Sequence, residues 1–377
     1  MRESPINLFN ATKTVVIKTN NSCNLHCTYC YDEFNQIKAR PSLSNETYGK
    51  IQDKLISYSK NKGIDHLNII WHGGEPMLMG LGFYKKAIRQ QQECELKFFN
   101  LMQTNVTLLN AEWMDFFKAN DFKIGISFDG SPKANSVHRQ KTEIVMRSIR
   151  ELNVNGITPS VICVISDQNY VYWKELFDFF ADFDVEYIDL VPCYENNGRY
   201  TLTDEHYINF YTHVFDLWLK NEGRPNIRTF SNIVDLLKGN DMTEDFVTCS
   251  LTGRCGEIIS VSPEGDVYFC DCLPKEPANM IGNVIKNNLY SLSKSSNYTE
   301  LKKYVLNINT ECLQCKFRSA CGGGCLTRRK SNFGKDYYCH ARKTLYSYIC
   351  KSLNIKVKPL SFTPIPAFTR GPQPSQD

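Results

Sequence analysis

Three cysteines lie close together near the start of the chain with the spacing C-x3-C-x2-C: Cys23, Cys27 and Cys30. A [4Fe–4S] cube has four irons, so three thiolates leave one iron without a protein ligand. An open iron can bind a small molecule, and the spacing therefore predicts a cluster with a reactive position. The alternative is a structural zinc site, which needs a fourth ligand that His26, between the cysteines, reaches only awkwardly.

A second set of eight cysteines lies in the last third of the chain. Its members follow the spacings C-x5-C-x14-C and C-x2-C-x5-C-x3-C, with one more cysteine after them. They are Cys249, Cys255, Cys270, Cys312, Cys315, Cys321, Cys325 and Cys339. Such spacing indicates metal or cluster binding, and two zinc sites are the alternative because C-x2-C pairs also bind zinc.

The composition indicates a reducing compartment. The chain has 16 cysteines in 377 residues, and no apolar stretch like that of a secretory signal precedes them. We therefore expect a cytoplasmic protein whose cysteines bind metal rather than form disulfides. No run of about 18 apolar residues predicts a membrane span. The net charge of +4 is too balanced to indicate nucleic-acid binding.

Strand-like and helix-like segments alternate through the first 230 residues or so. Strands are predicted at 14–18, 67–71, 98–103, 123–128, 160–165 and 187–191. Helices are predicted at 42–59 with Ser44 as N-cap, at 83–92, from Asn110 onward, at 143–152 and at 173–183. This alternation implies parallel strands joined by right-handed crossovers. Because six units fall short of a closed eight-stranded barrel, we expect an α/β fold built on an open, TIM-like (β/α)6 partial barrel.

The loops that could do chemistry follow the predicted strands. In parallel barrels the active site lies at the carboxyl ends of the strands. The three-cysteine loop follows the first strand, and Gly73-Gly74-Glu75-Pro76 follows the second. Glycine lets backbone approach a ligand closely, and Glu75 or nearby carbonyls can accept hydrogen bonds from an ammonium group. Taken alone, the tetrapeptide is equally consistent with a simple turn.

The three-cysteine loop and the Gly-Gly-Glu-Pro segment together resemble the signature of the radical S-adenosylmethionine (SAM) enzymes. The eight later cysteines resemble those of the SPASM domain. The resemblance extends over residues 12 to 350. It implies a radical SAM partial barrel at 1–235, a small cysteine-rich SPASM domain at 236–350 and a tail at 351–377. It also implies SAM and three [4Fe–4S] clusters, one that binds SAM and two that are auxiliary.

The resemblance assigns residues to the SAM pocket. Tyr29 matches an aromatic position against the adenine, and Gly73, Gly74, Glu75 and Pro76 match the motif that holds the SAM amino group. Residues after the third and fourth strands are implied to contact the ribose and the methionine carboxylate: Asn105, Ser127 and Asp129. An arginine usually pairs with that carboxylate, because the guanidinium fork fits it. Arg139 and Arg147 are the candidates, although either is also consistent with a solvated surface charge.

The resemblance also divides the eight later cysteines into two auxiliary clusters. The first cluster takes Cys249, Cys255, Cys270 and Cys325. The second takes Cys312, Cys315, Cys321 and Cys339. Five cysteines are left over: Cys94, Cys163, Cys193, Cys272 and Cys350. Most of them are expected to be buried small apolar residues. The alternative, that a leftover cysteine faces the cavity, applies to Cys193, near the mouth after the sixth strand, and to Cys272, next to a cluster ligand.

In the family, a 5′-deoxyadenosyl radical removes a hydrogen atom from the substrate, and the auxiliary clusters accept an electron. An oxidation of this kind also needs a base within hydrogen-bond reach of the substrate. Asp271, directly after Cys270, matches the aspartate that serves as base in the anaerobic sulfatase-maturating enzymes. The alternative for Asp271 is an acceptor of a local backbone N–H.

Two groups of radical SAM/SPASM enzymes fit the chain. One oxidises Cys or Ser on an unfolded sulfatase to formylglycine, and Asp271 with the compact length favours it. The other matures ribosomal precursor peptides, for example by cyclophane-type or ether cross-links. The position of Tyr31 directly after Cys30, and Asn105-Val106-Thr107 in place of Asn-Gly-Thr, depart from the sulfatase maturases. We therefore expect a cross-linking peptide maturase, with sulfatase maturation as the alternative.

The expected partners follow from this chemistry. They are a peptide or unfolded protein substrate and an electron donor such as flavodoxin or ferredoxin, with no membrane and no nucleic acid. The 13 residues before the first strand are too few for a winged-helix leader-recognition domain, so the peptide is expected to bind at the barrel mouth or on the SPASM surface. A third hypothesis, a binding protein with inert clusters, is disfavoured by the intact three-cysteine loop.

Overall fold

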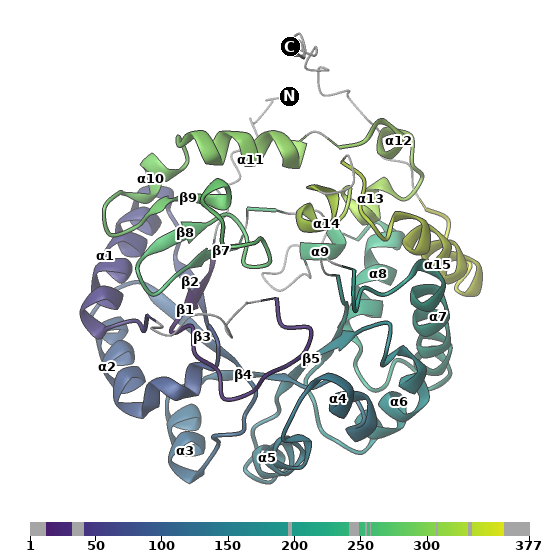
Figure 1. Ribbon diagram of the computed structural model, residues 1–377, viewed down its shortest axis with the longest axis horizontal. Helices are drawn as coiled ribbons and strands as arrows, with labels where there is room; N and C mark the ends of the chain where they lie inside the picture. The colour runs from purple at the N-terminus through teal and green to yellow at the C-terminus, as the bar shows by residue number, and fades with distance from the viewer. Residues whose placement is uncertain are drawn as a thin grey trace.

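The computed structural model describes residues 13–31, 41–194, 198–240, 249–252, 255–256, 258–306, 308–330 and 334–357. One nine-stranded sheet runs through this part of the chain in the order β6-β5-β4-β3-β2-β1-β7-β8-β9. Its first six strands curve into an arc with helices on the outer side, and the later segments lie across the opening of the arc (Figure 1).

The arc is a parallel sheet built from the first half of the chain. Each neighbouring pair from β1 to β6 is parallel. The strands are β1 (Thr14–Lys18), β2 (His66–His72), β3 (Lys97–Thr104), β4 (Lys123–Ser127), β5 (Ser160–Ile165) and β6 (Ile188–Pro192). All six predicted strands are confirmed, and so is the open partial barrel.

Helices connect these strands and cover the outer face of the sheet (Figure 1). They are α1 (Asn45–Lys62), α2 (Gly80–Gln92), α3 (Ala111–Ala119), α4 (Pro132–His138), α5 (Thr142–Val154), α6 (Trp173–Ala181), α7 (Asp204–Lys220) and α8 (Arg228–Lys238), with short 3₁₀ turns at Pro76–Met79 and Tyr170–Tyr172. Ser44 caps α1 by accepting from Thr47 N, as predicted, and Asn110 caps α3 in the same way. Helices α4, α7 and α8 were not expected from the residue pattern.

Aromatic packing fills the layer between the sheet and the first helices. Trp71 on β2 is fully buried, and its ring meets Tyr48 of α1 and Tyr84 of α2. The Trp71 Nε1 donates to Asn100 Oδ1 at 2.8 Å, so burial leaves no indole donor unpaired.

The later part of the chain extends the same sheet. Strand β7 pairs in parallel with β1, from Thr14↔Ile258 to Ile17↔Val261. Strands β8 and β9 then add antiparallel neighbours. The elements are α9 (Cys249–Thr252), β7 (Ile258–Val261), β8 (Asp266–Tyr268), a 3₁₀ turn (Pro277–Asn279), β9 (Met280–Asn283), α10 (Leu289–Leu292), α11 (Ser296–Leu306), α12 (Thr310–Leu313), α13 (Arg318–Cys321), α14 (Leu326–Lys330) and α15 (Cys339–Ser352).

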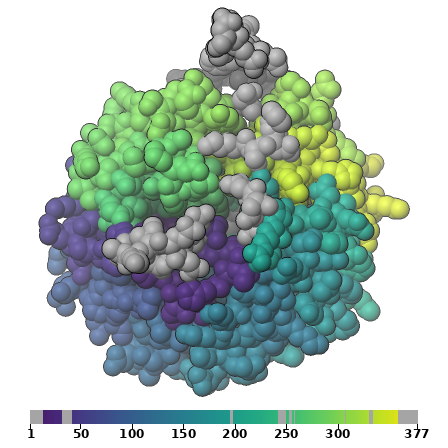
Figure 2. Space-filling model, viewed as in Figure 1, coloured from purple at the N-terminus to yellow at the C-terminus, as the bar shows by residue number. Residues whose placement is uncertain are grey.

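This arrangement places the cysteine-rich segments beside the mouth of the barrel. Figure 2 shows the green and yellow later segments along one side of this face and the blue and teal barrel segments along the other. Most of the tail predicted at 351–377 lies outside the described residues, which end at 357. Within the described part of the chain, no helix is both long and apolar enough to cross a membrane.

Candidate active site and cluster-binding cysteines

The Gly73-Gly74-Glu75-Pro76 segment holds the three-cysteine loop in place. Gly74 N donates to Asn20 O at 2.9 Å, and Glu75 N donates to Ser22 O at 2.8 Å. A Cβ atom on Gly74 would lie 2.0 Å from Ser22 O, which no real side chain tolerates. The glycine is therefore required because two backbone segments meet there, and Pro76 ends the contact by opening a 3₁₀ turn.

The carboxylate of Glu75 is already engaged by the chain itself. Its Oε1 accepts from Met77 N at 2.9 Å and from Thr104 Oγ1 at 2.7 Å, and its Oε2 accepts from Asn105 N at 2.8 Å. Burial raises the pKa of Glu75, and these hydrogen bonds act against the rise. Glu75 thus ties the end of β2 to the end of β3. The backbone carbonyls of the segment are the better candidates for binding an ammonium group.

Asn105 supports the cysteine loop from the end of β3. Its Nδ2 donates to Asn24 Oδ1 at 2.9 Å and lies 3.9 Å from the Sγ of Cys23. The next residue, Val106, has φ = 50°, a conformation that suits glycine and is rare for a β-branched residue. Val106 thus adopts here the backbone conformation that a glycine at this position would favour, at the cost of backbone strain. Ser127, at the end of β4, accepts from Gln103 Nε2 at 3.0 Å.

Arg139, Asp129 and Tyr29 form one buried cluster beside Cys27. Arg139 Nε donates to Asp129 Oδ2 at 3.1 Å, and its Nη1 lies 3.9 Å from the Cys27 Sγ. The Tyr29 hydroxyl also donates to Asp129, and its ring faces the guanidinium at 5.2 Å. Arg147 is exposed on α5. Of the two candidate arginines, Arg139 alone lies beside the cysteine loop.

The four cysteines of the first predicted auxiliary set lie close together, and a fifth cysteine lies among them. Burial raises the pKa of the Cys249 thiol, and its neighbours Cys325, Cys272 and Cys255 add to the rise. Cys270 shares a hydrogen bond with Cys272 and also lies near Cys249 and Cys325. The first predicted set is therefore brought together in space. The leftover Cys272 lies within this group as well.

The second predicted set also converges. Burial raises the pKa of Cys312, and the thiols of Cys321 and Cys315 add to the rise. Burial likewise raises the pKa of Cys339, whose neighbours include Cys312 and Cys321. These four cysteines come from α12, the turn after it, α13 and the start of α15. The fold therefore gathers residues that are up to 27 positions apart in the sequence.

The donor sets fit iron–sulfur clusters. A cube spreads its four thiolates over four irons. Across the described residues, no three His, Cys, Asp or Glu side chains are arranged to share a single metal ion. Near both cysteine sets, the buried guanidinium of Arg329 has two nitrogens, Nε and Nη2, with no hydrogen-bond partner. A buried cationic donor of this kind fits an anionic group such as a thiolate-bound cluster.

Asp271 lies where the two halves of the molecule meet. Its carboxylate is 15% exposed and lies 3.2 Å from the Nζ of Lys18, the last residue of β1. It accepts from Tyr31 Oη at 2.7 Å and from Ser260 Oγ at 2.9 Å. Burial acts to raise the pKa of Asp271, but Lys18, Lys275 and His72 outweigh it, so the pKa lies well below its usual range.

Lys18 and the contact of Tyr31 with Asp271 were not expected from the residue pattern. The position of Tyr31 directly after Cys30 had weighed against sulfatase maturation, yet its hydroxyl reaches Asp271. Lys18 is the last residue of an apolar strand. A lysine that is buried at the carboxyl end of a barrel strand is a candidate site residue, and this position is the signal that could have identified Lys18.

Two family models match the chain. The radical SAM superfamily matches residues 17–180, and the iron–sulfur cluster-binding SPASM domain matches residues 252–316. An open parallel barrel, a three-thiol loop at its mouth and two converging sets of four cysteines are the features of this class. The chain is a radical SAM protein with a SPASM domain, and its cofactors are a SAM-binding [4Fe–4S] cluster, SAM and auxiliary clusters.

Similar proteins of known name match most of the chain. A cysteine-type anaerobic sulfatase-maturating enzyme of Clostridium perfringens is 26% identical over 86% of this chain and 93% of its own length. A serine-type anaerobic sulfatase-maturating enzyme of Bacteroides thetaiotaomicron is 28% identical over 92% of this chain and 91% of its own length. The chain is thus a radical SAM enzyme that is similar over most of its length to anaerobic sulfatase-maturating enzymes.

Solved structures agree with this fold. The structure described as anSMEcpe with bound AdoMet superposes with a TM-score of 0.79 at 25% identity, covering 90% of this chain and 94% of that one. Streptococcus suis SuiB bound to S-adenosylmethionine superposes with a TM-score of 0.64 at 16% identity, covering 88% and 77%. The likeness to SuiB concerns the fold alone.

Proposed function

We propose that this protein oxidises a cysteine or serine side chain of a peptide or unfolded protein to formylglycine. The observation that carries the proposal is the position of Asp271. Its ionised carboxylate lies between Tyr31, next to the three-cysteine loop, and Cys270, in the first auxiliary set. A base at this point would lie between the cysteines expected to hold the SAM-binding cluster and those expected to hold the first auxiliary cluster.

The proposed oxidation balances as follows. A –CH2–OH or –CH2–SH group loses one hydrogen atom, one proton and one electron, and a double bond forms between carbon and the heteroatom. When bound, SAM with its cluster supplies the hydrogen-atom acceptor, and an auxiliary cluster supplies the electron acceptor. Asp271 accepts the proton. For a cysteine substrate, water then replaces sulfur, and hydrogen sulfide is released.

The chain positions Asp271 for this task through charged neighbours. Lys18 is 4% exposed and keeps the carboxylate ionised before the proton is transferred. Ser260 and Tyr31 fix its orientation through hydrogen bonds. Lys18, Ser260 and Lys275 also line a cavity of about 280 Å³ beside the carboxylate. This cavity offers space for part of a peptide substrate.

The cross-linking reaction expected from the sequence has less support. Two sulfatase-maturating relatives match 86% and 92% of the chain at 26% and 28% identity. SuiB, whose structure with a precursor peptide is known, shares only the fold. The two departures from the sulfatase-maturase pattern are also weaker arguments against this reaction than the sequence suggested. The Tyr31 hydroxyl reaches Asp271, and Val106 adopts the glycine-like conformation. An electron donor such as flavodoxin or ferredoxin is part of the proposal.

Anaerobic turnover with SAM and a reductant tests the proposal. Two matched peptides that carry a sulfatase-type site, one with cysteine and one with serine, are compared with an aromatic-rich precursor peptide. We expect an aldehyde on a sulfatase-type peptide, seen by mass spectrometry and by capture with a hydrazide probe. Loss of hydrogens only from the aromatic-rich peptide, with no carbonyl, would establish cross-linking and overturn the proposal.

A further inference from the structure

Arg329 is among the largest fully buried side chains of the described residues, with 1% of its surface exposed. It lies on α14, one turn after Cys325, and its backbone N donates to the Cys325 carbonyl at 3.0 Å. Its Nη1 donates to Val305 O at 3.3 Å, whereas Nε and Nη2 have no partner. A buried charged group with unused donors is costly unless an anion lies beside it.

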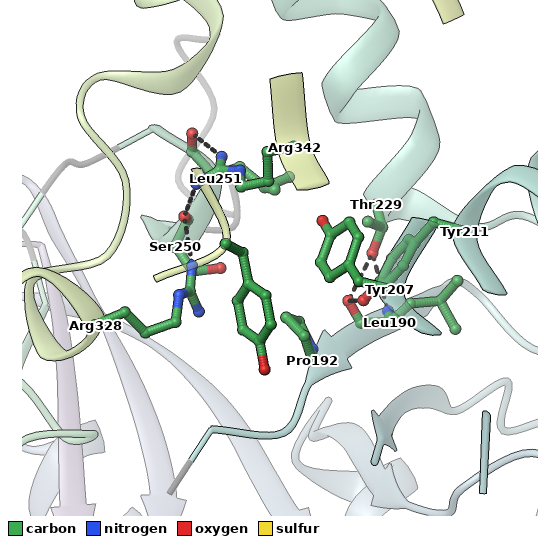
Figure 3. A pocket seen from close by; sticks show the side chains of 10 residues that line it. Leu190, Pro192, Tyr207, Tyr211, Thr229, Ser250, Leu251, Arg328 and Arg342 are labelled. Atoms are coloured by element: carbon green, nitrogen blue, oxygen red, sulfur yellow. Dashed lines mark hydrogen bonds between the residues drawn. The ribbon is translucent and has the colours of Figure 1, made fainter. Parts of the chain in front are cut away.

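The buried carboxylate nearby forms ion pairs with arginines other than Arg329. Asp336 lies 3.0 Å from Arg328 Nη2 and 3.4 Å from Arg342 Nη1. Figure 3 shows Arg328 and Arg342 also reaching the carbonyls of Ser250 and Leu251, directly after Cys249. In the described part of the chain, no ion pair joins Arg329 to a carboxylate, so this buried region holds three guanidinium groups and one carboxylate.

The groups that could balance Arg329 are the cluster cysteines. Burial raises the pKa of Cys255, and the positive charge of Arg329 acts against that rise. Burial also raises the pKa of Cys312, and Arg329 again acts against it. Cys255 belongs to the first auxiliary set and Cys312 to the second. The guanidinium therefore lies within electrostatic reach of both sets.

We propose that Arg329 is the counter-ion and hydrogen-bond donor shared by the two auxiliary clusters, and that it sets their reduction potentials. A cube held by four thiolates carries net negative charge, which matches the unpaired guanidinium. Positive charge and N–H donors near the sulfurs favour the reduced form and raise the potential. Arg329 is a positioning residue in this role. The inference depends on the auxiliary clusters and not on which product the enzyme makes.

The test compares variants of the full-length reconstituted protein under anaerobic conditions. Iron content and EPR-monitored redox titration are measured for the wild type, Arg329→Met and Arg329→Lys. The signal of the SAM-binding cluster is identified by its change when SAM is added. The control is Lys303→Gln on neighbouring α11, which also removes one positive charge but from a side chain that is 67% exposed.

We expect Arg329→Met to shift the potential of at least one auxiliary cluster to more negative values, or to lower the iron content by about one cluster. Arg329→Lys keeps the charge and should retain iron, with a smaller shift. Lys303→Gln should change neither quantity, because solvent screens an exposed charge. Full iron with unchanged potentials in Arg329→Met would overturn the proposal. Equal loss of clusters in both Arg329 variants would do the same, because shape rather than charge would then be the requirement.

Discussion

At the scale of single residues, Asp271 is the group on which the proposed oxidation depends. Asp271→Asn keeps the shape but removes the base, so formation of the aldehyde should fall by about 100-fold or more. The hydrogen atom is removed by a different group, so 5′-deoxyadenosine should still form. Chromatography of the nucleoside and mass spectrometry of the peptide measure the two steps separately.

The matched control for Asp271→Asn is Glu276→Gln, an exposed carboxylate five positions later in the segment between β8 and β9. It should leave both products at wild-type levels. If Asp271→Asn makes aldehyde at the wild-type rate, Asp271 serves only as a local hydrogen-bond acceptor.

The low pKa of Asp271 predicts how activity depends on pH. The base works when ionised, so in the wild type its acid limb should lie below the usual carboxyl range of about 4. Lys18→Met removes the positive charge that lowers the pKa of Asp271 most. The pKa of Asp271 should therefore rise, and the acid limb should move to higher pH. Rates of product formation against pH, with equal iron content in both proteins, measure the shift. An identical acid limb in the variant would contradict this account of Lys18.

At the scale of elements, the contact between the Gly73–Pro76 segment and the three-cysteine loop decides whether the SAM-binding cluster forms. Gly74→Ala places a Cβ 2.0 Å from Ser22 O, so the loop must move away. We expect loss of about four irons of about twelve, together with loss of SAM binding, while the auxiliary clusters remain. The control is Gly82→Ala on α2, where a Cβ meets nothing within 4 Å. Full iron and normal SAM affinity in Gly74→Ala would contradict the prediction.

The turn after β3 carries strain at Val106. A β-branched residue at φ = 50° costs about 1–2 kcal/mol, which is similar to what its burial contributes. Val106→Gly should therefore change stability by no more than about 1 kcal/mol. Val161→Gly, at an equally buried site in β5, should cost about 3 kcal/mol or more. Apparent midpoints of denaturant unfolding, compared between the two variants, measure the difference. Equal losses would show that the Val106 backbone is not strained.

At the scale of the whole molecule, the sheet joins the barrel to the cysteine-rich part through the pairing of β1 with β7. Removing the chain after residue 235 would leave β1 as an open edge strand with apolar faces. We expect this fragment to aggregate, because unpaired strand edges associate with each other. Size-exclusion chromatography of the fragment and of the full chain tests this. A stable monomeric fragment would show that the barrel does not need β7.

The alternation of strands and helices determined the barrel from the sequence alone, because burying a parallel sheet on both faces requires apolar strands separated by helical crossovers. Cysteine spacing likewise indicated the three-cysteine loop, because its three thiols lie within eight residues of sequence. Both expectations depend on which residue types follow one another along the chain, and the sequence gives this directly. The division of the later cysteines into two sets came from the resemblance to the SPASM domain, since Cys249 and Cys325 lie 76 positions apart. The helices α7 and α8 were missed because they follow the last barrel strand without a strand to mark their end.

Tertiary structure alone decided which distant groups meet. It selected Arg139 rather than Arg147 by placing one beside Cys27 and the other in solvent. It paired Lys18 with Asp271 across 253 positions of sequence and buried Arg329 between two cysteine sets. Such contacts arise from the pairing of β1 with β7 and from the packing of short helices. No periodicity or spacing along the chain encodes them, because their energy comes from charges brought together only after folding.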